Sequence, residues 1–192
     1  MNAERKSAIK DYASTTGMLY LFSLMLSMFS VVFIIDAVPK WIRFLVSFLF
    51  LAPLFYLAFY QGLTSGEKLY KKAAKSVLGD LHGMKQVHAP YYKCIYYVIG
   101  YVLPLWIVFI VATITKLTLV RFIGLAFTFP IMLLFSSVKV LDLGAVKPVD
   151  LAVFLPYVLV LAGVFAIGFV LKVQRLKKQQ ADIQSELRSF NN

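Results

Sequence analysis

The sequence predicts an all-α integral membrane protein, a polytopic bundle of transmembrane helices, and three observations support this fold class. Hydrophobic residues make up 60% of the 192 residues and charged residues only 15%. Globular chains average about 45–50% apolar residues and roughly 25% charged residues. The charges are segregated, so that long stretches carry none and short stretches carry most of them. Several apolar runs approach the about 20 residues that a helix needs to cross a bilayer. This pattern excludes a single water-soluble domain.

Five apolar runs account for the predicted bundle. They are Gly17–Ile35, Trp41–Gln61, Tyr91–Thr113, Phe122–Val138 and Leu151–Leu171. Four of the runs contain a proline, and because the backbone in lipid has few alternatives to helix, these prolines predict kinked spans. No small-x-small cleavage pattern follows the first run, which we therefore interpret as a retained span and not a signal peptide.

The run Phe122–Val138 is the shortest, and the distribution of Lys and Arg decides how we interpret it. With an inside N-terminus and four crossings, 14 of the 20 Lys and Arg residues lie inside, whereas five crossings leave only 11 inside. Cytoplasmic loops collect Lys and Arg. The sequence therefore favours four transmembrane helices, with Phe122–Val138 as a re-entrant or interfacial segment on the outer side and both termini cytoplasmic. Five full spans are the alternative.

The chain is accordingly divided into one transmembrane domain, residues 1–171, and a cytoplasmic helical tail, residues 172–192. A basic cytoplasmic loop, residues 62–90, joins the second and third spans. Within this loop apolar residues recur every four positions from Leu69 to Leu81, which predicts an amphipathic helix that Gly79 and Gly83 end. The opposite side of this helix carries Lys68, Lys71, Lys72 and Lys75.

We expect this basic helix to lie along the inner leaflet. Its lysines would contact anionic lipid headgroups or an anionic partner, each lysine near the surface contributing about 1 kcal/mol. The alternative is a passive anchor that only fixes the orientation of the neighbouring spans. A net charge of +11 is then explained by the membrane surface, and no nucleic-acid partner is predicted.

The tail continues the last span without a Gly or Pro, so the helix is predicted to extend into the cytoplasm. An apolar face repeats along it at heptad a and d positions, over about two and a half heptads. This face is a candidate contact for a protein partner or for a second copy of the chain, and a solvated helix without a partner is the alternative. The face consists of Val173, Leu176, Ile183, Leu187 and Phe190.

Residues that carry catalytic or metal chemistry are scarce. The single cysteine, Cys94, excludes a disulfide framework, and His82 and His88 are spaced six apart, which does not fit a common metal site. Ionisable residues such as Arg43 and Asp142 fall near the ends of the apolar runs and not at their centres, which disfavours a proton relay. We predict no catalytic residue, no metal site and no cofactor.

Two passages resemble known membrane families. The stretch "FYQGLTSGEKLYK" resembles the Gly-x-Thr-x-Gly-Lys turn of RDD-family proteins, but Glu67 intervenes before Lys68 and the first span lacks the Arg and Asp that name that family. The layout "GEKLYK…GDLHGMK" before a Tyr-rich span, within Tyr56 to Pro104, resembles small uncharacterised multi-span membrane proteins of Gram-positive bacteria. This second resemblance implies a protein of the bacterial cytoplasmic membrane and supplies no residue roles.

These features lead to one functional hypothesis and one rival. The first is a non-enzymatic membrane subunit that scaffolds or regulates a larger complex through its basic loop and helical tail. The rival is a small transporter or channel for a neutral or lipid-like substrate, because broken helices and re-entrant segments are common in transporters.

The predicted topology is testable with single cysteines at Ser7, Lys85, Lys147 and Asn192, introduced after Cys94 is replaced by serine. A membrane-impermeant thiol reagent applied to whole cells should label only the Lys147 position, the one site predicted to face outward. Labelling at both Lys85 and Asn192 would reverse the orientation, and labelling at Asn192 without Lys85 would establish five crossings.

Overall fold

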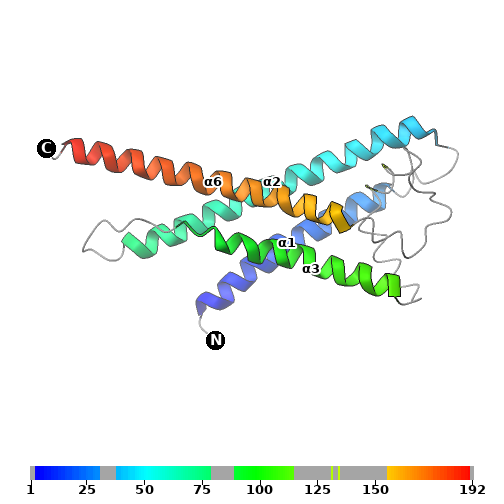
Figure 1. The fold of residues 1–192 in the computed structure, drawn as a ribbon, viewed down its shortest axis with the longest axis horizontal. Coiled ribbons are helices and arrows are strands. Elements are labelled where there is room, and N and C mark those ends of the chain that lie inside the picture. The colour runs from blue at the N-terminus through cyan, green and yellow to red at the C-terminus, as the bar shows by residue number, and fades with distance from the viewer. Residues whose placement is uncertain are drawn as a thin grey trace.

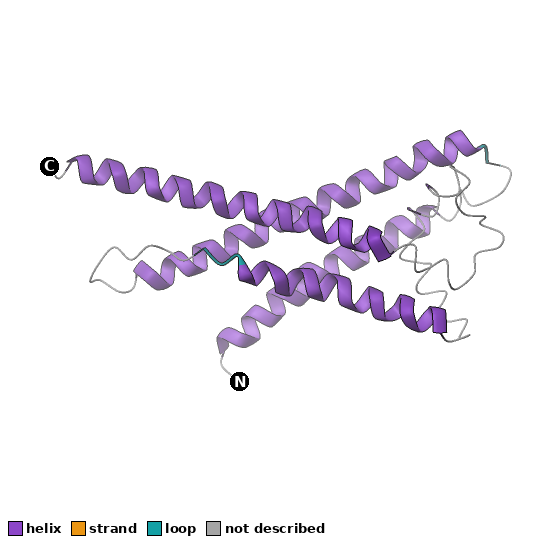
Figure 2. Ribbon diagram, in the orientation of Figure 1, coloured by secondary structure: helices purple, strands orange, loops and turns teal. Residues whose placement is uncertain are grey.

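The computed structural model describes residues 3–30, 38–78, 89–114, 131, 134 and 155–190. Within these residues the chain is all-helical, as predicted, with four long helices and no strand (Figure 2). The helices are α1 (Ala3–Ser30), α2 (Lys40–Leu78), α3 (Tyr92–Ile114) and α6 (Leu155–Phe190). By length and composition, α2, α3 and α6 could each cross a membrane, which supports the predicted membrane protein.

Two of the helices are much longer than a bilayer core is thick. Helix α2 has 39 residues and α6 has 36, which correspond to about 58 and 54 Å at about 1.5 Å per residue. A hydrocarbon core of about 30 Å holds little more than half of either helix. The predicted extension of the last span into the tail is therefore present, and α2 has a similar extension.

The continuity of α2 corrects the prediction of a loop over residues 62–90 with its own helix. Residues 69–78 are helical as expected, but residues 62–68 are helical as well, so the second span continues without a break after Gln61. A separate helix along the leaflet would need such a break. The two glycines that follow Gln61 do not interrupt the helix, because α6 packs directly against them. Residues 79–88, with the predicted helix end, lie outside the described residues.

The directions of the helices alternate along the chain. Helices α1 and α3 run one way through the bundle and α2 and α6 run back, so that the N- and C-termini lie toward the same end (Figure 1). The end of α3 and the beginning of α6 accordingly lie toward the opposite end of the described bundle (Figure 1). The segment Phe122–Val138 lies outside the described residues except for Ile131 and Leu134, so its re-entrant path stays a prediction.

The core lies between α2, α3 and α6, with α1 packed on one side. Side chains that are almost fully buried come from each of these three helices: Leu54 and Ala58 from α2, Phe109 from α3, and Leu161 and Phe169 from α6. Many large apolar side chains point outward instead. Met28, Leu49 and Ile114 are 67%, 70% and 76% exposed, a distribution that suits lipid and not water.

The closest helix contact is between α2 and α6, which run parallel and cross at glycines. A Cβ atom at Gly62 would overlap the carbonyl oxygen of Phe165, and one at Gly168 would overlap that of Phe59. At Gly66 a Cβ would lie 2.8 Å from the carbonyl oxygen of Phe169. Small residues spaced four apart let transmembrane helices approach backbone to backbone. These three glycines therefore fix where the two longest helices cross.

The crossing predicts opposite effects for two Gly→Ala substitutions. Gly62→Ala should lower the free energy of unfolding in detergent by about 1–3 kcal/mol, because the new methyl group forces the two backbones apart. Gly163→Ala is the matched control on α6, since nothing lies within 4 Å of its Cβ position. This control should be neutral or slightly stabilising, because alanine favours helix over glycine by up to about 1 kcal/mol. If a denaturant titration showed the same loss of unfolding free energy for both variants, the assignment of Gly62 to the helix crossing would be contradicted.

Candidate functional site

The extended ends of α2 and α6 form the first candidate site, which we call the fork (residues 67–78 and 172–190). The two helices diverge beyond their glycine crossing (Figure 1). Glu67 bridges them at the base of the fork, with its carboxylate 2.8 Å from Lys172 Nζ of α6 and 2.6 Å from Lys71 Nζ of α2. Glu67 follows the apolar run that ends at Gln61. Hydrogen bonds from Lys172 and then from Lys71 lower the pKa of Glu67 to about 2, so this carboxylate is charged at physiological pH.

A second link lies one turn further along the fork. The Tyr70 hydroxyl donates a hydrogen bond of 2.6 Å to Gln180 Oε1, and the Tyr70 side chain is buried, at 5% exposure. Gln180 lies between Leu176 and Ile183 on the tail and continues their heptad spacing with a polar side chain. Its amide therefore bonds to α2 of the same chain, and the base of the fork is held by both charge and hydrogen bonding.

The predicted lysines on α2 are exposed. Leu69 and Ala73 are half-buried against the core, as expected for an amphipathic helix. Lys72 lies three residues after Leu69, so it borders this apolar side and is not opposite to it. The α6 arm adds further exposed cations, which sequence reasoning did not single out as a site. The exposed cations of the fork are Lys68, Lys71, Lys72 and Lys75 on α2, and Arg175, Lys177 and Lys178 on α6.

The predicted partner face of the tail is partly used within the molecule, which corrects that prediction. Val173 is fully buried and Leu176 is half-buried against the core, because this part of α6 lies on α2. Ile183 is 58% exposed and is available to a partner. Leu187 and Phe190 lie within α6, but their side chains are outside the described residues, so their role stays a prediction.

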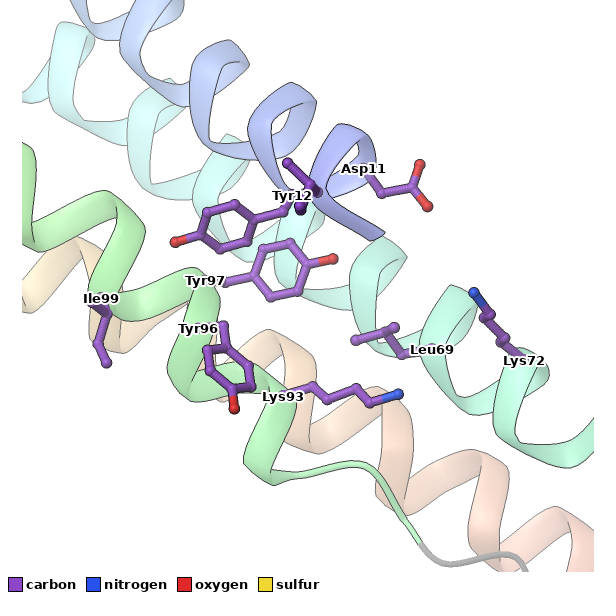
Figure 3. Close-up of a pocket in the computed structure, with 9 residues that line it drawn as sticks. Asp11, Tyr12, Leu69, Lys72, Lys93, Tyr96, Tyr97 and Ile99 are labelled. Carbon is purple, nitrogen blue, oxygen red and sulfur yellow. The ribbon is translucent and has the colours of Figure 1, made fainter. Parts of the chain in front are cut away.

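A groove between α1, α2 and α3 is the second candidate site, and sequence reasoning did not predict it (Figure 3). It has a volume of about 430 Å³ and lies on the same end of the bundle as the fork. Its walls are apolar and aromatic, and three charged residues complete the lining, namely Asp11, Lys72 and Lys93. The apolar and aromatic lining consists of Ile9, Tyr12, Leu69, Tyr96, Tyr97 and Ile99.

Tyrosines join α1 to α3 and so build one wall of this groove. Tyr12 packs on Tyr97, with ring centroids 5.1 Å apart, and the absence of a side chain at Gly100 makes room for the Tyr12 ring. About two turns further along α1, Tyr20 donates to the carbonyl oxygens of Gly100 and Tyr101, at 3.2 and 2.5 Å. Tyr97 is therefore part of the core as well as of the groove wall.

Comparison with models of known protein families, with curated proteins and with solved structures yields no match. Assignment of residue roles therefore depends on the geometry of the fork and the groove. Within the described ranges, no three His, Cys, Asp or Glu side chains gather as metal ligands do.

The hydrogen bond between Tyr70 and Gln180 should contribute measurably to the packing of α2 against α6 at the base of the fork. In a double-mutant cycle with Tyr70→Phe and Gln180→Leu, we expect a coupling of about 0.5–1.5 kcal/mol in the free energy of unfolding in detergent. Tyr60→Phe on the same helix is the control, because Tyr60 is 54% exposed and its loss should change stability by less than about 0.5 kcal/mol. A coupling near zero would mean that the two side chains do not act together.

Proposed function

We propose that this protein is a non-enzymatic subunit of a membrane complex, which scaffolds or regulates its partners through the fork. In this proposal the chain crosses a bacterial cytoplasmic membrane four times, with Phe122–Val138 re-entrant or interfacial. The fork and both termini face the cytoplasm. The alternating helix directions, with the termini toward one end (Figure 1), support an even number of crossings.

The observation that carries the proposal is the continuity of the fork with the membrane helices. Each arm extends a helix that is long and apolar enough to span, and the arms are joined at their base by Glu67 and Tyr70. A rigid, water-exposed extension of this kind presents a fixed surface to a partner. A tail attached by a loose linker would not.

The charge of the fork indicates the kind of partner. Seven exposed cations line its two arms where side chains are described. The acidic residues of the arms are Glu67, which is paired, Asp182 and Glu186. Opposite charges guide association and suppress wrong partners. The fork therefore fits the acidic face of a cytoplasmic protein or domain, with Ile183 as an apolar contact between the charges.

The rival function, a small transporter or channel for a neutral or lipid-like substrate, is favoured by one separate observation. Arg43, expected to lie near a span end, is buried at 7% exposure in α2. Ser23 and Ser27 of α1 are buried as well. Buried polar and charged groups in membrane helices often belong to a substrate path. Substrate uptake into proteoliposomes that depends on Arg43 would favour this function over the scaffold.

The scaffold predicts that partner binding depends on one face of α6. Ile183→Asp should reduce by about tenfold the amount of a specific protein that co-purifies in mild detergent, because a charge replaces an apolar contact. Ala181→Asp is the control, since it adds the same charge to another exposed face of the same arm. Quantitative mass spectrometry measures the proteins that co-purify with each variant and with the wild type. Equal recovery of every protein with the two variants and the wild type would contradict the proposal.

A further inference from the structure

The groove of Figure 3 is lined by residues from the ends of α2 and α3 where charged side chains meet the apolar runs of these helices. Its α3 wall begins at Lys93 and continues inward to Ile99, which is about 9 Å deeper along the helix. Its α2 wall consists of Leu69 and Lys72, beyond the apolar part of that helix. The groove is therefore apolar at its inner end and charged at its outer end.

The inner end is open toward the surroundings of the bundle. Tyr96 and Ile99 line the groove and are 60% and 49% exposed, so a chain in the surrounding bilayer reaches it from the side. The volume of about 430 Å³ falls within the range of roughly 300–1,000 Å³ typical of small-molecule sites. Walls of Leu, Ile and tyrosine rings suit an acyl chain better than a polar solute.

The outer end carries two cations and one anion. Lys93 extends from α3 toward α2, and Lys72 and Asp11 lie on that same side (Figure 3). Their formal charges leave an excess of one positive charge. Lysine ammonium groups bind phosphate as point charges, and a carboxylate accepts a hydrogen bond from a headgroup hydroxyl.

We infer that the groove binds one anionic phospholipid of the adjoining leaflet, with an acyl chain along Tyr96 and Ile99 and the phosphate between Lys72 and Lys93. The excess of a single positive charge fits a headgroup with one phosphate, such as phosphatidylglycerol. The groove shares Leu69 and Lys72 with the α2 arm of the fork, whereas its α1 and α3 walls belong to the groove alone. Binding of lipid does not require a protein partner.

Binding is measured by native mass spectrometry of the purified full-length chain, titrated with phosphatidylglycerol in detergent. The double variant Lys72→Gln/Lys93→Gln should weaken binding about tenfold or more, because both phosphate contacts are lost. Lys68→Gln/Lys75→Gln is the control, since it removes the same charge from exposed positions that do not line the groove. The control should change the affinity by less than about twofold. Phosphatidylcholine and free glycerol phosphate should not displace the bound lipid.

A second variant tests the groove itself without changing charge. Ile99→Trp should fill the groove and remove binding, whereas Ile95→Trp, at a position 58% exposed on the same helix and outside the lining, should not. Circular dichroism confirms that each variant is helical. If the two double lysine variants weakened lipid binding equally, general surface charge would explain the effect and the inference would be overturned. Full binding in Ile99→Trp, or equal competition by phosphatidylcholine, would overturn it as well.

Discussion

The direct approach of the α2 and α6 backbones is the constraint on which the rest of the structure depends. Lipid tails are as apolar as leucine, so no hydrophobic force draws membrane helices together, and close packing must do so. Gly62, Gly66 and Gly168 permit that packing because a side chain at any of them would meet a backbone of the other helix. Once the crossing is fixed, Glu67 reaches Lys172 and Tyr70 reaches Gln180. The base of the fork thus follows from the crossing.

Helix α2 serves both candidate sites because its two sides meet different neighbours. Gly66 and Tyr70 face α6 and belong to the fork, whereas Leu69 and Lys72 line the groove with α1 and α3. Positions three and four apart share a helix face, so these pairs form two stripes along the same turns. A loop over residues 62–90 could not hold both stripes in register. The unbroken helix does so, and the correction to the predicted loop therefore matters for function.

Sequence reasoning predicted what depends on local periodicity and missed what depends on tertiary contact. The apolar runs gave the helices, and the four-residue spacing that begins at Leu69 gave the side of α2 that carries lysines. Gly62 and Gly66 within "GLTSG" have the four-residue spacing that is typical of close helix packing. Both glycines follow the predicted end of the second span, in the segment that the sequence predicts to be a loop. The burial of Val173 and the groove around Tyr97 depend on which helices pack against each other. The periodicity of a single sequence does not reveal that pairing.

The relative strengths of these contacts decide how the fork is held. The Glu67–Lys172 pair is partly exposed, with side chains 34% and 30% accessible, so water and salt screen its attraction. The hydrogen bond from Tyr70 contributes about 0.5–1.5 kcal/mol. A methyl group forced into the crossing costs more, about 1–3 kcal/mol. Packing therefore sets the angle of the arms, and the polar links adjust it. Most exposed cations of the fork lie outside these contacts, which leaves them accessible to a partner.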